Sequence, residues 1–135
     1  MPLQVELVSP ERVLLVTEAS MVVARTLGGG DIAFLSGHAP FVGALDTWVV
    51  EIVAVDGTRS RAAAHGGFIS IMQDRVTILS DLAELSETID ASRAEAAAAS
   101  AEAAVGASES DHEIAEATAA LARAHARLRA ANVSV

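Results

Sequence analysis

The chain has 135 residues, which is long enough for one hydrophobic core with an appended element, and it contains neither cysteine nor lysine. The lack of these two residue types excludes disulfides, thiolate metal sites, a P-loop lysine and Schiff-base chemistry. The formal net charge of −9 disfavours direct contact with nucleic acid or anionic lipid, because like charges repel.

The N-terminus and the hydropathy pattern predict a soluble protein. The first residues, M-P-L-Q-V-E-L, lack the basic and then apolar pattern of a secretory signal peptide. No apolar run reaches the roughly 18 residues that indicate a membrane-spanning helix. We therefore expect any membrane contact to be made through a partner.

The N-terminal part of the chain alternates apolar and polar residues between frequent turns, which is typical of short β-strands. Leu3–Val8 predicts a first strand, and Val13–Thr26 predicts two strands separated by a break at Glu18-Ala19-Ser20. Three successive glycines at 28–30 predict a loop, since glycine adopts backbone conformations that other residues rarely reach. Residues 36–40 predict a second irregular loop.

Stronger turn signals mark the strands that follow. Asp56-Gly57 predicts a hairpin between strands at 48–54 and 59–64. Turns at Gly66-Gly67 and Gln73-Asp74 delimit further short strands. Those strands are expected at 68–71 and 76–79, and another short strand is expected earlier in the chain, at 31–35. The pattern predicts a small sandwich or barrel, and we expect its core to contain Trp48, Phe34, Phe41 and Phe68.

Alanine dominates the C-terminal part, where 19 of the residues from 91 to 131 are alanine, the best helix former. Asp90 is placed to cap a first helix, and Ser110 or Asp111 a second. The break between them is expected in G-A-S-E-S, residues 106–110. The apolar stripe of the second helix is narrow, because alanines separate its large residues, which are Ile114, Leu121 and Leu128.

The two patterns together predict the fold class. We expect an N-terminal β-sandwich of about ten short strands over residues 1–86. A C-terminal antiparallel two-helix hairpin should follow over residues 87–135, with helices at about 90–105 and 111–131. Small side chains bury little area, so the hairpin should be marginally stable alone.

Three segments, in this order, resemble one known family. Residues 30–40 read G-D-I-A-F-L-S-G-H-A-P, similar to the family pattern G-E-I-G-I-L-P-G-H-A-P. Residues 65–81 contain H-G-G-F-I-S-I and V-T-I-L-S-D, similar to G-G-F-x-x-V and V-T-I-L-A-D. Residues 89–94, I-D-A-S-R-A, fit the family's I/L-D-x-x-R-A nucleotide motif. Along essentially its whole length the chain resembles the ε subunit of the bacterial rotary ATP synthase.

The resemblance implies a mechanical role rather than catalysis. Members of the family sit with the γ subunit on the central stalk, rest on the membrane-embedded c ring, and help couple rotation to ATP synthesis. Their hairpin lies folded against the sandwich or extends into the catalytic α/β head, where it blocks ATP hydrolysis. We therefore expect a peripheral, non-catalytic subunit on the cytoplasmic face of the bacterial plasma membrane. No cofactor is required, and ATP is a regulatory ligand in some members.

The resemblance also assigns an ATP-binding set, which is Glu84, Ile89, Asp90, Arg93, Ala94, Arg123 and Arg127. Arg123 and Arg127 are four residues apart and share one helix face. In a folded hairpin that face approaches Arg93, and three guanidiniums would meet a triphosphate. A simpler interpretation stays open. In it, Asp90 is only a helix cap, Arg93 is solvated, and the other two arginines complement the helix dipole.

Two contact sets follow from the same resemblance. Arg123, Arg127 and Arg129 form a basic tip that is expected to contact an acidic surface of the catalytic head when the hairpin is extended. Asp31 and His38 are expected at the edge that faces γ and the c ring. Alternatively, Asp31 is a solvated turn residue and His38 bonds its own loop.

Other functions receive less support from the residues. Ser36 and His38 lack the third group that would orient a nucleophile pair. His65, His112 and His125 lack metal-ligand spacing, and we expect them in the core, on the surface and on a helix face respectively. One rival interpretation is a free-standing nucleotide sensor with a β-scaffold and a helical clasp. Another is an enzyme, for which no convergent catalytic set is found.

Overall fold

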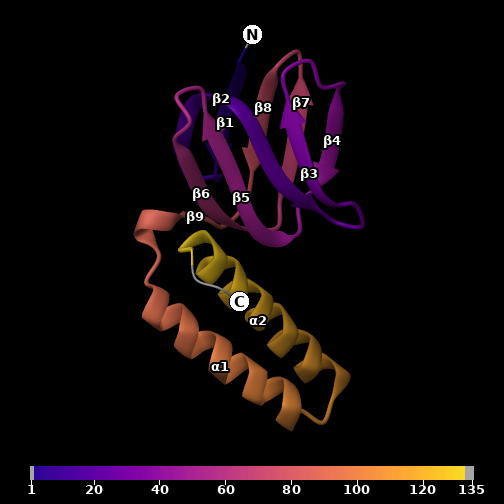
Figure 1. The fold of residues 1–135 in the computed structure, drawn as a ribbon. Coiled ribbons are helices and arrows are strands. Elements are labelled where there is room, and N and C mark those ends of the chain that lie inside the picture. The colour runs from indigo at the N-terminus through magenta and orange to yellow at the C-terminus, as the bar shows by residue number, and fades with distance from the viewer. Residues whose placement is uncertain (1, 133–135) are drawn as a thin grey trace.

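The computed structural model describes residues 2–132 of the chain (Figure 1). These residues form a β-sandwich followed by two antiparallel helices, which confirms the predicted fold class. The strands of this part of the chain are β1 (Leu3–Val8), β2 (Val13–Thr26), β3 (Gly30–Leu35), β4 (Phe41–Ala44), β5 (Thr47–Ala54), β6 (Arg59–His65), β7 (Phe68–Met72), β8 (Arg75–Leu79) and β9 (Ala83–Leu85).

The strand β2 links the two layers of the sandwich. Its first half pairs with β1 and its second half with β3, while β5 lies along its other edge. The register with β5 shifts between Ala19 and Met21, so the backbone bulges at Ser20. The predicted break at Glu18-Ala19-Ser20 is therefore wrong, because a bulge bends one 14-residue strand without ending it.

The turns between consecutive strands were predicted more accurately than the shortest strands. Asp56-Gly57 joins β5 to β6, and Gln73-Asp74 joins β7 to β8 with both residues at positive φ. The elements that the pattern did not predict are β4, β9 and a 3-10 helix, η1 (Ser86–Thr88). They are three or four residues long, too short for periodicity to identify them.

Large aliphatic side chains fill the space between the two layers. On β1, alternation turns Leu3, Val5 and Leu7 inward and the polar residues between them outward. Ile52 on β5 and Ile78 on β8 join the same cluster and are almost fully buried. Burial of each such side chain stabilises the sandwich by about 1.5–3 kcal/mol.

Two of the four aromatic residues expected in the core lie elsewhere. Phe34 is fully buried and Phe41 packs against the core, as predicted. Phe68 is 58% exposed, because it alternates with the buried Ile69 and faces outward from β7. Trp48, the second residue of β5, is half-buried outside the core cluster, and the Arg25 guanidinium lies 4.2 Å from its ring centroid.

The C-terminal helices are α1 (Ala91–Ala107) and α2 (Asp111–Ala130). Asp90 caps α1 by accepting a hydrogen bond from the backbone N–H of Arg93, and Ser110 caps α2 in the same way. The helix α1 continues through Gly106, so the predicted break is shorter than 106–110. A single glycine near a helix end costs only about 1 kcal/mol relative to alanine, which the surrounding alanines offset.

Small side chains form the contact between the two helices. Ala94, Ala98, Ala124 and Leu128 make a buried cluster, against which Leu121 packs. The apolar stripe by which α2 packs on α1 is therefore shorter than predicted at the N-terminal end of α2. Ile114, in the first turn of α2, lies outside the cluster and is 37% exposed.

The helix α2 lies between the sandwich and α1 (Figure 1). It contacts β5 and β6, where Ala126 and Ala130 pack with Ala63, Val49 and Ile89. The hairpin is thus folded onto the outer face of the sheet through small side chains. Within residues 2–132, neither helix combines the length and apolar character that crossing a membrane requires.

Candidate functional site

A pocket of about 420 Å³ lies where the sandwich passes into the hairpin. We call it the hinge pocket, and its walls come from β9, η1, the start of α1 and the end of α2. Its lining residues are Glu84, Thr88, Ile89, Asp90, Arg93, Ala94, Ala97 and Arg127. All the residues that the family resemblance assigned to ATP binding, except Arg123, therefore lie around one pocket.

Arg123 lies outside the hinge pocket. It lines a separate groove between the two helices, together with Glu113, Glu116 and Ser108. Arg123 and Arg127 do share a helix face, but one turn of helix moves a side chain about 5.4 Å along the axis. The two arginines therefore line different pockets in the folded hairpin.

The carboxylate of Glu84 connects the two domains. Its Oε1 accepts a hydrogen bond of 2.7 Å from Nε of Arg127 and one of 2.9 Å from Nε2 of His65. We call these three residues the hinge clasp. The side chain of His65 is 5% exposed, and its Nδ1 is buried without a hydrogen bond. Because Nε2 carries the proton, Nδ1 is the bare acceptor of a neutral imidazole.

Burial and charge set the protonation states of the clasp. Burial raises the pKa of Glu84, but the hydrogen bonds from Arg127 and His65 outweigh it, so the pKa lies below its ordinary value. Burial lowers the pKa of His65, the charge of Arg127 adds to this, and the hydrogen bond to Glu84 opposes it. At neutral pH the clasp is therefore an ion pair between Glu84 and Arg127, oriented by a neutral His65.

The other two charged groups of the hinge pocket differ in whether they already have a hydrogen-bond partner. Oδ1 of Asp90 accepts the backbone N–H of Arg93 at 3.1 Å, so Asp90 does act as the helix cap of the simpler interpretation. The guanidinium of Arg93 is exposed and has no hydrogen bond or ion pair within residues 2–132. An anion in the hinge pocket would meet Arg93 directly but would compete with Glu84 for Arg127.

The structure does not bring Asp31 and His38 together. Asp31 is the second residue of β3 and pairs with Nε of Arg25 at 2.9 Å. His38 follows the other end of β3, where Nδ1 bonds the carbonyl oxygen of Ala39 at 2.7 Å and the ring packs on Phe34. A six-residue strand spans about 20 Å, so the two residues belong to opposite ends of the sandwich.

Two candidate functional features of the molecule were not predicted from the sequence. His65 was expected only as a core residue, yet it orients the carboxylate that holds the hairpin. An outward-facing apolar surface on β4, β7 and β8 was also missed, although strict alternation along β7 and β8 signals it. Its exposed side chains are Val42, Phe68, Met72 and Leu79.

Three of the four histidines lie in the environments predicted for them. His65 is buried, His112 is exposed, and His125 is half-buried on α2. Among residues 2–132, no group of three or more His, Asp or Glu side chains is arranged to hold a metal ion. The polar groups of the hinge pocket are suited to anion binding and to holding the hairpin in place.

Comparison with known proteins assigns both domains to one family. Residues 2–86 match the beta-sandwich domain of the ATP synthase Delta/Epsilon chain, and residues 87–132 match its long alpha-helix domain. The chain is 46% identical over 93 residues to the ATP synthase epsilon chain of Streptomyces avermitilis, covering 69% of this chain and 74% of that one. It is 47% identical over 98 residues to that of Thermobifida fusca, covering 69% of each.

A solved structure shares the fold. A chain in the cryo-EM structure of the Euglena gracilis mitochondrial ATP synthase, OSCP/F1/c-ring, superposes with a TM-score of 0.84 at 22% identity. The superposition covers 97% of this chain and 81% of that one. At this identity the likeness shows the fold alone, whereas the matches to both domains show the family. The chain belongs to the ATP synthase delta/epsilon chain family.

Proposed function

We propose that this chain is the ε subunit of the central stalk of a bacterial rotary ATP synthase. The observation that carries the proposal is that both domains match one family, in a chain about 45% identical to bacterial ATP synthase epsilon chains. In this role the chain is a non-catalytic, peripheral subunit at the cytoplasmic face of the plasma membrane. It helps couple rotation of the c ring and the γ subunit to ATP synthesis.

The sandwich is the proposed binding domain for the stalk. Its apolar surface on β4, β7 and β8 supports contact with the γ subunit, because a cluster of exposed apolar side chains commonly marks a protein interface. Asp31 and His38 lie at opposite ends of β3. We therefore assign them to different neighbours, one at the γ subunit and one at the c ring.

The hairpin is the proposed regulatory domain. When it leaves the sandwich, Arg123, Arg127 and Arg129 reach the catalytic head and inhibit ATP hydrolysis. The small side chains at the contact of α2 with the sheet support this proposal, since elements with few large apolar contacts open at low free-energy cost. The arginines on α2 suit an acidic surface on the head.

ATP is the proposed ligand of the hinge pocket in the folded state. The pocket volume of about 420 Å³ falls in the range of small-molecule sites, which is about 300–1,000 Å³. Arg93 is free to meet the phosphates, while Arg127 exchanges Glu84 for a phosphate oxygen. ATP would then favour the folded, non-inhibitory state, because it binds the two states unequally.

Two assays test the proposal against a free-standing nucleotide sensor. The purified chain is mixed with γ, with and without ATP, and stable association is measured by gel filtration. A stalk subunit binds γ in both conditions. A chain that never binds γ but binds ATP is instead the free-standing sensor.

The second assay tests the regulatory part. The double substitution Arg123→Gln with Arg127→Gln is expected to weaken both ATP binding and inhibition of hydrolysis. Arg12→Gln with Arg75→Gln removes the same charge from the sandwich and is the matched control. Of the single substitutions, Arg127→Gln should account for the loss of ATP binding, since Arg123 lies outside the hinge pocket. Unchanged behaviour of the double variant in both measurements contradicts the regulatory proposal.

A further inference from the structure

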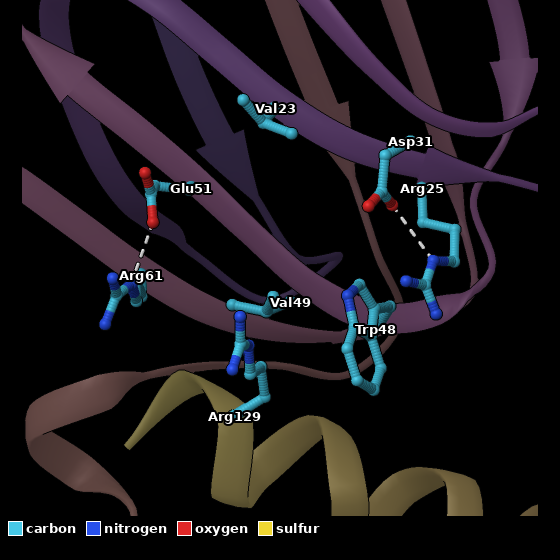
Figure 2. Close-up of a pocket in the computed structure, with 8 residues that line it drawn as sticks. All are labelled: Val23, Arg25, Asp31, Trp48, Val49, Glu51, Arg61 and Arg129. Carbon is cyan, nitrogen blue, oxygen red and sulfur yellow. Dashed lines mark hydrogen bonds and ion pairs between the residues drawn. The ribbon is translucent and has the colours of Figure 1, made fainter. Parts of the chain in front are cut away.

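A second cavity, of about 210 Å³, lies between α2 and the outer face of β2, β3, β5 and β6. We call it the sheet–helix cavity. Figure 2 shows Arg129 reaching from α2 toward the sheet, between Arg61 on one side and Trp48 with Arg25 on the other. We propose that the sheet–helix cavity binds a phosphate-type oxyanion, which bridges Arg129 to the arginines of the sheet.

This cavity is distinct from the hinge pocket. Arg127 and Arg129 are two residues apart on α2, which turns their side chains about 200° from each other around the helix axis. Arg127 therefore lines the hinge pocket while Arg129 lines the sheet–helix cavity. The proposal concerns a different ligand site from the one proposed for ATP, and either site can be present without the other.

The charges around the sheet–helix cavity do not balance. Asp31 pairs with Arg25, and Glu51 is shared between Arg61 and Arg59. Of the charged side chains that line the cavity, three are guanidiniums, those of Arg25, Arg61 and Arg129, and two are carboxylates, which leaves one positive charge in excess. The pKa of Glu51 lies below its ordinary value. The hydrogen bond from Arg61 lowers it most, burial raises it, and the hydrogen bond from Arg59 lowers it further. Both acids are already paired with arginines. The cavity is therefore a local region of positive charge on a chain whose net charge is −9.

The arginines also have hydrogen-bond donors to spare. Arg25 uses Nε for Asp31, and Arg61 uses Nε for Glu51 and Nη1 for Asn132. The guanidinium of Arg129 has no hydrogen bond or ion pair within residues 2–132. Each guanidinium carries five N–H groups in a planar fork that matches the oxygens of a phosphate. The unused donors come from both the sheet and α2.

The size and charge of the cavity indicate the class of ligand. At about 210 Å³ the cavity falls below the roughly 300 Å³ at which sites for drug-sized molecules begin, so it suits a small oxyanion. Phosphate carries a charge of about −1.5 to −2 at neutral pH, so it is attracted to the excess positive charge of the cavity. Because the anion would contact arginines of both the sheet and α2, its binding holds α2 against the sheet.

The single tryptophan of the chain provides the test. Trp48 lines the cavity and packs on Arg25, so its fluorescence reports on that arginine. The full chain is titrated with sodium phosphate, and with sodium chloride at matched ionic strength. We expect a saturable change in Trp48 emission with phosphate and none with chloride. The same response to both salts overturns the proposal.

Matched variants locate the response. Arg129→Gln should abolish the phosphate response, and since Arg129 is exposed, its circular dichroism should remain that of the parent chain. Arg75→Gln removes one exposed arginine from β8 and should respond like the parent chain. A phosphate response that survives unchanged in Arg129→Gln overturns the proposal.

A last titration, of a variant in the hinge pocket, distinguishes free phosphate from the phosphates of a nucleotide. Arg93→Gln removes the free guanidinium of the proposed ATP site but keeps the hinge clasp, so it leaves the sheet–helix cavity intact. A saturable Trp48 response of this variant to phosphate but not to ATP identifies free phosphate as the ligand. A response to ATP alone identifies a nucleotide phosphoryl group. A response to neither overturns the proposal without affecting the ATP site, which is measured separately in the parent chain.

Discussion

The two domains of this chain are held together by different kinds of contact. The sandwich encloses large aliphatic side chains, such as Leu7, Ile52 and Ile78, which are almost fully buried. The hairpin meets the sandwich mainly through alanines, among them Ala126 and Ala130, and through the hinge clasp. Large apolar contacts make the sandwich a permanent structure, whereas the hairpin depends on contacts that a competing ion or proton can replace.

One short chain thus combines a firmly packed domain with a hairpin that is held more weakly. Alanine buries little area, so removing α2 from the sheet forfeits little hydrophobic free energy. The specific part of the docking comes from polar contacts, Glu84 with Arg127 and Arg61 with Asn132. The hairpin can therefore leave while the sandwich stays folded, and substitutions in the two regions should have different consequences.

Phe34→Ala should have the largest effect, because it removes a fully buried ring from the core of the sandwich. We expect the free energy of unfolding of the whole chain to fall by about 3–5 kcal/mol, as measured by denaturant titration. Phe68→Ala, which truncates an exposed phenylalanine, should change it by less than about 0.5 kcal/mol. Similar losses in the two variants would contradict the assigned core.

Ala126→Leu should separate the two regions. Ala126 is fully buried against Ala63, and a larger side chain there costs about 1–3 kcal/mol. The amide NMR signals of Val49 and Ala63 should shift as the hairpin detaches, while the unfolding of the sandwich stays cooperative. Ala115→Leu, at an exposed position of α2, is the control and should leave these signals in place. Loss of the sandwich fold in Ala126→Leu would refute the separation.

Glu84→Gln should loosen the hairpin without affecting the core. The amide keeps the shape of the side chain but loses the ion pair with Arg127. We expect docking to weaken by about 0.5–1.5 kcal/mol, measured by native-state hydrogen exchange of the α2 amides. Glu95→Gln removes one exposed charge from α1 and should leave exchange unchanged. Equal exchange rates in the two variants would show that the clasp does not hold the hairpin.

Acidification should release the hairpin gradually. The docked state holds the pKa of His65 below its ordinary value of 6.5 and that of Glu84 below 4.5. The undocked state then binds protons more readily, so docking is strongest above pH 6.5 and weakens as the pH falls. Protonation of His65 weakens docking as the pH falls below 6.5, and protonation of Glu84 weakens it further as the pH falls below 4.5. Hydrogen exchange of α2 against pH measures this, and stronger docking in acid would reverse the assigned sign.

The sequence predicted best what depends on local pattern. Asp56-Gly57 predicted its hairpin because the turn conformation is a property of those two residues. Alternation and alanine content predicted the two domains in the same way. The bulge at Ser20 was mistaken for a break, because the choice between them depends on the strands that pair with β2.

The local sequence pattern could not predict contacts between residues that are far apart in the chain. His65 and Glu84 are 19 residues apart, and Glu84 and Arg127 are 43 apart, so only the fold brings the clasp together. The family resemblance supplied Glu84 and Arg127 as candidates but not His65. The sheet–helix cavity had no signal at all, since Arg25, Arg61 and Arg129 come from separate elements.

The proposed regulation requires the hairpin to leave the sandwich before it can inhibit hydrolysis. The chain contains no cysteine, so Ala63→Cys with Ala126→Cys introduces a single pair at the docking contact. The double variant is assembled into the ATP synthase, and ATP hydrolysis is measured before and after reduction, with each single variant as a control. We predict that the oxidised enzyme hydrolyses ATP without inhibition by the hairpin and that reduction restores the inhibition. Equal inhibition in both redox states, with the disulfide formed, would contradict the claim.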